Sequence, residues 1–138
     1  MSYKFLDHAT DAIIEVTAKD IKEAFSVTAN AVINLTLDQD KVEEKDQKDF
    51  SAKGKDLRYL LFSWIEEITF VLITGGFAIK RVEFDIEKNE GYKISAKAYG
   101  EPLDFHKHNF KVEIKAPTFY DMEIKENEGV YMRFLLDL

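Results

Sequence analysis

The sequence predicts an α+β domain in which two amphipathic helices pack on a largely antiparallel sheet. Apolar residues recur at three- and four-residue spacing in two segments, at about 20–37 and about 56–74. Beyond residue 81 the period falls to two, and apolar residues alternate with polar ones in several short runs. Helical stripes followed by half-buried strands with one wet face indicate the α+β class. The chain has 138 residues, so we expect one domain spanning 1–138.

The first expected helix runs from about Asp20 to Leu37. Asp20 can accept hydrogen bonds from the free amides of the first turn, and Glu23 can reach back as in a capping box. The apolar stripe consists of Ile21, Ala24, Phe25, Thr28, Val32 and Leu35. This face should pack on the sheet.

The second expected helix runs from about Asp56 to Thr74, with Asp56 as the N-cap. Gly75 and Gly76 can supply the left-handed residue that ends a helix. The apolar face consists of Leu57, Leu60, Leu61, Trp64, Ile65, Ile68 and Leu72. We expect Phe25, Leu61, Trp64 and Phe84 in the core, and the side chains of Lys53, Lys55 and Lys88 in solvent.

The alternating runs are expected to form strands with one buried face. The charged segment KVEEKDQKDF is expected to be a loop or an edge strand, and KNEG and ENEG are expected to be turns. The segment EPLDFHKHNF reads as a loop. The expected strands include 82–86, 94–98, 110–114, 122–124 and 130–136.

Composition excludes several classes of function. There are no cysteines, which rules out disulfides, thiolate catalysis and zinc–thiolate sites and fits a cytoplasmic protein. The formal net charge is −7, and nucleic-acid binding needs cations for the phosphates, so we expect no independent nucleic-acid binding. No signal peptide is apparent, and Glu66 and Glu67 interrupt the longest apolar segment, so we expect no membrane span.

Carboxylates at the two ends of the chain are candidate metal ligands. Asp7, His8 and Asp11 immediately precede the apolar run AIIEV, and Asp137 and Leu138 close the run VYMRFLLDL. Taken singly, an aspartate at a strand end is usually a solvated terminator. If the two ends meet, their carboxylates and the terminal carboxylate form a hard-oxygen cluster suited to calcium, magnesium or manganese. Sequence reasoning alone leaves open whether they meet.

The remaining candidates for chemistry are weaker. His106 and His108 have i, i+2 spacing, which is a weak transition-metal pattern within a segment that reads as a loop. His8 could assist a site, although a histidine beside a turn is more often a structural hydrogen-bonding residue. No nucleophile motif or glycine-rich phosphate loop is present, so no catalytic residue is assigned.

Motifs distributed over nearly the whole chain resemble those of the archease family. Each motif is weak alone, but their order and spacing together are fairly specific. They are FLDHATD at 5–11, IKEAF at 21–25, GKDLRYLLFSWIEEI at 54–68, AKAYGE at 96–101, VEIKAPTFYDM at 112–122 and the closing LLDL.

The resemblance implies a function as well as an α+β sandwich fold. Archeases are small accessory proteins of the RtcB-type RNA ligase, which joins tRNA halves and other RNA ends and is first guanylylated on a histidine with a metal and GTP. The resemblance therefore implies that this chain promotes ligase activation and turnover as a partner, in tRNA splicing and RNA repair. The alternative is a stand-alone metal-dependent phosphohydrolase that uses the same carboxylates and a metal-bound water.

The resemblance also implies a set of site residues. Asp11, Asp137 and Leu138 match the metal ligands of the family, and calcium is the expected ion, with magnesium or manganese as alternatives. Asp7 and His8 would lie next to that site. Lys115 matches a basic residue that could contact the ligase or a phosphate, and an ordinary surface lysine is the alternative.

The chain departs from the family pattern at two places. The usual signature D-H-T-A-D is replaced by Asp7-His8-Ala9-Thr10-Asp11, which keeps both aspartates at the same spacing. The family's K-A-x-T-Y-H becomes KAPTFY at 115–120, so that Tyr120 stands where a histidine is usual. The resemblance therefore assigns no role of that histidine to this chain.

Overall fold

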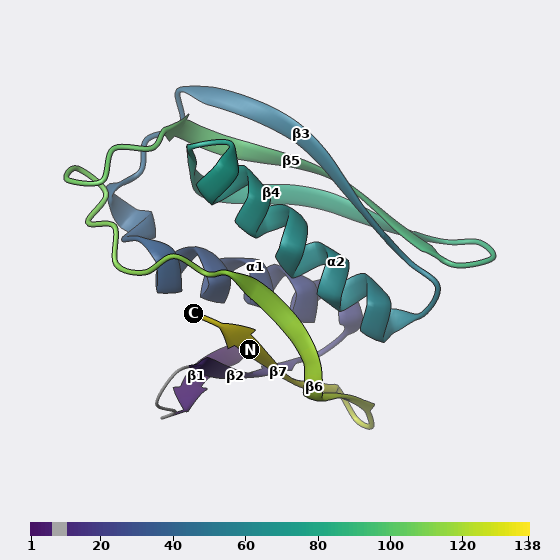
Figure 1. The fold of residues 1–138 in the computed structure, drawn as a ribbon. Helices are drawn as coiled ribbons and strands as arrows, with labels where there is room; N and C mark the ends of the chain where they lie inside the picture. Colours follow the sequence, from purple (N-terminus) through teal and green to yellow (C-terminus); the bar gives the residue numbers. More distant parts are fainter. Residues whose placement is uncertain (7–10) are drawn as a thin grey trace.

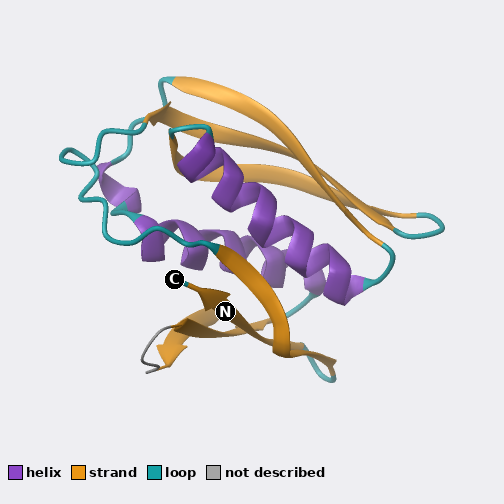
Figure 2. Cartoon of the chain, viewed as in Figure 1, coloured by secondary structure: helices purple, strands orange, loops and turns teal. Residues whose placement is uncertain are grey.

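Two antiparallel sheets enclose a layer of helices (Figures 1 and 2). The computed structural model describes residues 1–6 and 11–138. One sheet has the strand order β1 (Ser2–Leu6), β2 (Asp11–Ala18), β7 (Val130–Asp137) and β6 (Ala116–Glu126). The other has the order β3 (Asp46–Gly54), β5 (Tyr92–Pro102) and β4 (Phe77–Lys88). The expected α+β class is confirmed.

Each helix contacts both sheets. Helix α1 (Ile21–Thr36) packs against β2 and β4, and α2 (Leu57–Thr69) packs against β3 and β6. A short 3₁₀ turn, η1 (Gln39–Lys41), follows α1. Both helices therefore bury more than one face, and each sheet buries one face and leaves the other exposed. Among the described residues, no helix is long and apolar enough to cross a membrane.

The helix starts follow the expected capping chemistry. Asp20 Oδ1 accepts a hydrogen bond from the Glu23 amide at 2.8 Å, and Asp56 Oδ1 accepts one from the Tyr59 amide at 3.0 Å. Glu23 reaches back as predicted, but its Oε1 accepts from the Lys19 amide, one residue before the cap, at 3.0 Å. Both caps satisfy first-turn amides that have no partner within the helix.

The second helix ends in a π-helical turn, η2 (Phe70–Thr74). The Gly75 amide donates to the Phe70 carbonyl at 2.8 Å, and Gly76 adopts a φ of 59°. The expected end at Thr74 is therefore confirmed, although the last turn is wider than an α-helical one. Phe70 is 57% exposed, and π-turns of this kind are frequent at functional sites.

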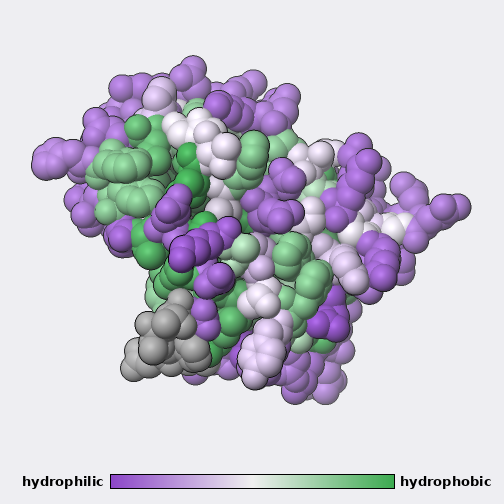
Figure 3. Space-filling view, in the orientation of Figure 1, coloured by the Kyte–Doolittle hydropathy of each residue, from purple (hydrophilic) through white to green (hydrophobic). Residues whose placement is uncertain are grey.

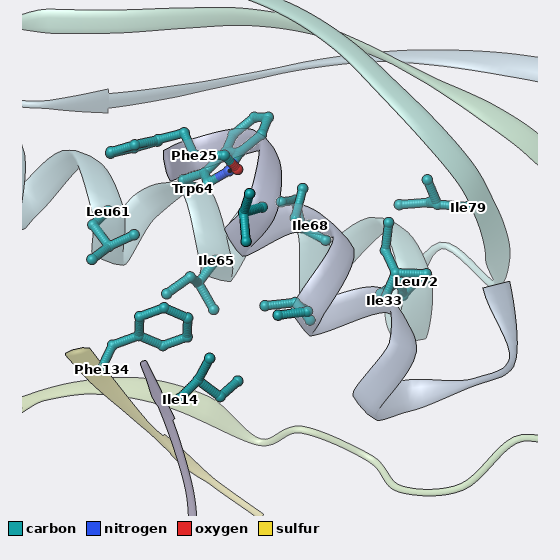
Figure 4. Close-up of a cluster of buried hydrophobic side chains, with 14 of the residues drawn as sticks. Ile14, Phe25, Ile33, Leu61, Trp64, Ile65, Ile68, Leu72, Ile79 and Phe134 are labelled. Carbon is teal, nitrogen blue, oxygen red and sulfur yellow. Dashed lines mark hydrogen bonds between the residues drawn. The ribbon is translucent and has the colours of Figure 1, made fainter. Parts of the chain in front are cut away.

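Trp64 and Phe25 lie among the buried side chains of the core (Figure 4), and the partly buried rings of Phe50 and Phe84 pack against them. Trp64 lies 5.5 Å from Phe50, 6.4 Å from Phe25 and 4.9 Å from Phe84, measured between ring centroids. Its indole Nε1 donates to the Phe25 carbonyl at 2.9 Å, so burial leaves no unpaired donor.

The predicted burial is largely confirmed. Phe25, Leu61 and Trp64 are fully buried, and the three lysines expected in solvent are exposed. Phe84 was expected in the core but is only partly buried. Its strand, β4, is an edge of the three-stranded sheet, so side chains on its inner face are covered less completely.

The prediction of a strand at 110–114 is wrong. Residues 103–115 have no strand and cross from the three-stranded sheet to β6. Their amides bond to separate elements, Lys111 to the Thr36 carbonyl and Lys115 to the Asp137 carbonyl, both at 2.8 Å. Ile114 is buried while both lysines are exposed, so the segment alternates like a strand without having a strand neighbour. The charged segment at 41–50 leads into β3, an edge strand, as expected.

Replacing Trp64 with alanine should lower the free energy of unfolding by about 3–5 kcal/mol, because a fully packed ring leaves a cavity. Urea denaturation at neutral pH measures the loss. Phe105→Ala is the matched control, since Phe105 is 65% exposed and should cost little. Similar small losses in both variants would contradict the assignment of Trp64 to the core.

Candidate functional site

The two candidate carboxylates lie side by side. Strands β2 and β7 pair antiparallel with Asp11 directly opposite Asp137. Directly opposed residues on neighbouring strands have Cβ atoms about 4.5–5.5 Å apart. Their neighbours Ala12 and Leu136 are buried toward the helices, so the two aspartates belong to the outer face at one rim of the sheet. The chain ends therefore meet, as a shared site requires.

The end of the chain is held on both sides. Asp137 pairs with Asp11 of β2 and with Ala116 of β6. The Lys115 amide adds a hydrogen bond of 2.8 Å to the Asp137 carbonyl. The side chain of Leu138 is half-buried against the core, and this contact holds the residue that carries the terminal carboxylate.

The donors at this rim suit a hard cation. Carboxylate oxygens from Asp11, Asp137 and the terminal residue are ligands that calcium and magnesium prefer. Like charges placed directly opposite on neighbouring strands repel, and a bound cation would relieve that repulsion. Within residues 1–6 and 11–138, no three His, Cys, Asp or Glu side chains could hold a metal. Asp7 and His8, also expected near the site, lie outside the described residues.

Opposite charges alternate across the rest of this outer face. Lys4 Nζ lies 3.2 Å from Glu15, whose Oε2 accepts from the Tyr131 hydroxyl at 2.6 Å. Arg133 lies opposite Glu15 in the register and bridges to Glu123 at 3.1 Å. The hydrogen bonds from Tyr131 and then Lys4 lower the pKa of Glu15. The opposed carboxylates at the rim depart from this alternation.

A groove lies beside the rim, between the end of α2 and residues 113–117. It has a volume of about 390 Å³ and is lined by Phe70, Lys115 and Pro117 among others. The buried hydroxyl of Thr69, which also lines it, has no hydrogen-bond partner among the described residues. Because Ala116 pairs with Asp137, the groove is continuous with the chain end. Lys115 is exposed there, as a partner contact would need.

The residue in place of the usual histidine extends into solvent. Between Thr118 and Glu123 the pairing of β6 with β7 is interrupted, and Asp121 has a φ of 58°. Within this bulge Phe119 stacks on Phe62 with ring centroids 4.4 Å apart. Tyr120 is 76% exposed. The bulge therefore anchors one ring on α2 and presents the next to solvent.

The histidine pair in the loop does not form the metal site that its spacing weakly suggested. The Asp104 amide donates to Nδ1 of His108 at 3.0 Å, so the proton is on Nε2, which donates to Glu101 at 2.9 Å. Both ring nitrogens of the fully buried His108 are therefore used within the protein. His106 is exposed, and its amide bonds to Asp104.

Sequence reasoning missed the buried partner of this histidine. Glu101 is 4% exposed and accepts from His108, from the Glu43 amide at 3.0 Å and from Lys107 Nζ at 2.9 Å. These bonds, with that from His108 the largest, hold the pKa of Glu101 far below its usual range. The pair ties residues 103–115 to the end of β5. Glu101 and His108 are seven positions apart, and no sequence pattern indicated that they would pair.

The fold and the acidic rim define a small α+β sandwich with a candidate hard-cation site formed by its two chain ends. A model of the Archease protein family (MTH1598/TM1083) matches residues 3–138, and the chain belongs to this family. Protein archease of Pyrobaculum islandicum is 36% identical over 141 residues, covering 100% of this chain and 96% of that protein. Protein archease of Pyrococcus abyssi is 37% identical over 125 residues, covering 90% and 88%.

A solved structure shows the same fold. The solution structure of Methanobacterium thermoautotrophicum protein 1598 superposes with a TM-score of 0.78 at 27% sequence identity. The match covers 99% of each chain. The resemblance inferred from the six motifs is therefore confirmed at the level of both family and fold.

Glu101→Gln should reduce stability in a pH-dependent way. A carboxyl group whose pKa is lowered by folding stabilises the protein above its unfolded pKa of about 4.3, and the contribution is lost as the pH falls below that value. At pH 7 the variant should lose about 1–3 kcal/mol, because charge-assisted hydrogen bonds are replaced by neutral ones. The difference from the parent should shrink below about pH 4.

Urea midpoints between pH 3 and pH 7 measure this effect. Glu126→Gln is the matched control, because Glu126 is exposed at the end of β6 and should change stability little at any pH. A loss in Glu101→Gln that stays constant across the range would show that the charge of Glu101 is not the cause.

Proposed function

We propose that this chain is an accessory factor that activates an RtcB-type RNA ligase by promoting its metal- and GTP-dependent guanylylation. The observation that carries the proposal is the direct pairing of Asp11 with Asp137, at the positions that match the metal ligands of the family. The biological setting would be tRNA splicing and RNA repair in the cytoplasm. The protein would act as a partner and not as an enzyme.

The proposed cofactor is a divalent cation bound at the rim, with calcium favoured and magnesium or manganese as alternatives. Asp11, Asp137 and the terminal carboxylate of Leu138 would hold it through oxygen. When bound, the ion supplies positive charge that a phosphate or carboxylate of the partner can share. Asp7 and His8 are proposed to lie next to it.

Activation is proposed to work by differential binding. A protein that binds one state of the ligase more tightly shifts the ligase toward that state. The rim lies at the end of β7, which pairs with β2 on one side and with β6 on the other. Because both neighbours hold it, the rim can enter a cleft without rearranging. Lys115 and Phe70, exposed along the adjacent groove, are proposed as contacts that hold the rim in place.

Calcium should raise the melting temperature of the parent protein, because a ligand that binds only the folded state stabilises it. Asp137→Ala should abolish that rise, since it removes one of few protein ligands. Without metal, the variant should melt at or slightly above the parent temperature, because a neighbouring like charge has been removed.

Thermal melts with calcium and with chelator make this comparison. The matched control is Asp49→Ala, which removes an exposed carboxylate from β3 in the other sheet and should keep the calcium response. An equal calcium response in parent and Asp137→Ala would remove the proposed metal site.

Asp11→Ala and Asp137→Ala should abolish stimulation of ligase guanylylation while leaving the fold intact. Lys115→Ala should weaken stimulation less, because it would contact the partner without holding the ion. A single-turnover assay of the ligase with GTP measures the effect, again with Asp49→Ala as the control. Full stimulation by Asp137→Ala would refute the rim mechanism.

The same samples test the enzyme alternative. The purified protein alone, with manganese or magnesium, should not hydrolyse a phosphoester. Hydrolysis that is lost in Asp11→Ala would instead support the metal-dependent phosphohydrolase.

A further inference from the structure

Lysines gather at one end of the three-stranded sheet, where β3 leads into α2 and the β4–β5 hairpin turns (Figure 1). Lys53, Lys55 and Lys93 line a shallow hollow of about 650 Å³ there, together with Tyr92. Lys88 lies opposite Tyr92 in the register, with its Nζ 5.6 Å from the ring centroid, and so belongs to the other face of the sheet from Lys93. We call Lys53, Lys55 and Lys93 the basic cluster. Hydrophilic side chains cover this end of the molecule in Figure 3.

The basic cluster is not neutralised by the protein. Within residues 1–6 and 11–138, none of its three lysines forms an ion pair, and all three are exposed. Elsewhere on this acidic chain most lysines do have acidic partners, such as Lys19 with Glu23 and Lys41 with Asp38. The cluster therefore presents free positive charge on a protein whose net charge is −7.

The arrangement is unfavourable for the sheet itself. Lys53 and Lys93 are directly opposed on β3 and β5, and like charges in that position repel. Glu87 lies opposite Lys93 on the other side, and Glu90 also lines the hollow, so the three lysines have two glutamates beside them. A bound anion would relieve the repulsion between the lysines.

The elements that carry the lysines pack closely through glycines. A Cβ atom at Gly54 would lie 2.2 Å from the Leu60 amide nitrogen, and one at Gly91 would lie 2.9 Å from the Gly54 carbonyl oxygen. The end of β3, the start of α2 and the β4–β5 turn therefore meet backbone to backbone, which holds the lysines of the three segments near one another.

We propose that the basic cluster binds the phosphate backbone of a single-stranded nucleic acid. Lysine ammonium groups bind phosphates as point charges, without the fixed geometry that a bidentate arginine contact needs. Tyr59 is 44% exposed beside Lys55, whose Nζ lies 4.4 Å from its ring centroid, and Tyr92 lines the hollow. Lysines beside aromatic rings that are exposed, like Tyr59, or partly buried, like Tyr92, form a surface on which single strands can bind.

This proposal differs from the expectation, drawn from the net charge, that the chain does not bind nucleic acid by itself. An overall charge of −7 averages over the surface, and three lysines without an ion pair among the described residues lie together at this end. The binding should be weak and independent of sequence, with a dissociation constant of about 10⁻⁴ to 10⁻⁶ M at moderate salt. The cluster lies in the three-stranded sheet, whereas the acidic rim belongs to the four-stranded sheet, so the two can be tested separately.

The test is fluorescence anisotropy of a labelled single-stranded RNA of about 12 nucleotides, titrated with the full chain at several salt concentrations. The double variant Lys53→Ser/Lys93→Ser should bind at least tenfold more weakly at low salt. Its slope of log affinity against log salt should fall by about 1.4, or about 0.7 for each phosphate that is no longer neutralised. The matched control is Lys19→Ser/Lys41→Ser, which removes two lysines that have acidic partners and should bind like the parent.

Folding and specificity are controlled in the same experiment. The double variant at Lys53 and Lys93 should melt no lower than the parent, because it removes two opposed like charges. Asp137→Ala should bind the RNA as the parent does, because the rim is not part of the basic cluster. If the parent does not bind RNA, the RNA-binding proposal fails and the proposal of a metal site at the rim is unaffected. The proposal is overturned if the parent does not bind at low salt, if both double variants weaken equally, or if a poly-glutamate peptide binds as tightly as the RNA.

Discussion

The antiparallel pairing of β2 with β7 is the contact on which both the fold and the candidate site depend. It joins the first and last parts of the chain and forms the centre of the four-stranded sheet. Its inner side chains, including Ile14 and Phe134, are fully buried beneath the helices. A shift of one residue would expose them and would also separate Asp11 from Asp137. The packing that stabilises the fold therefore also fixes the geometry of the rim.

Two arrangements of acidic residues in this protein show different uses of a carboxylate. Glu101 is enclosed by a histidine, a lysine and a backbone amide, so its charge is compensated within the chain and holds a loop in place. Asp11 and Asp137 face each other at a rim that solvent can reach. An enclosed carboxylate such as Glu101 suits a structural role, whereas carboxylate oxygens gathered at an accessible rim suit a hard cation.

Much of the fold could be predicted from local chemistry. Helix α1 ends within a residue of its expected limits, and both N-caps act as the sequence indicated, because capping and amphipathic periodicity depend on residues within a few positions. The prediction of a strand at 110–114 was wrong. Apolar and polar residues alternate there because one side of the segment is buried, and not because the segment pairs with a strand. The π-turn at Phe70–Thr74 was also missed, since its apolar pattern resembles that of an α-helix.

The sequence by itself determined the residue types at the site, the helix caps and the total charge, and its motifs indicated the family. Tertiary structure alone decided that Asp11 lies opposite Asp137, that both ring nitrogens of His108 are occupied, and that Lys53 lies opposite Lys93. These facts depend on strand register and loop packing between segments far apart in the chain. No local pattern encodes such pairings, because burial of whole faces selects them only when the sheets and helices assemble.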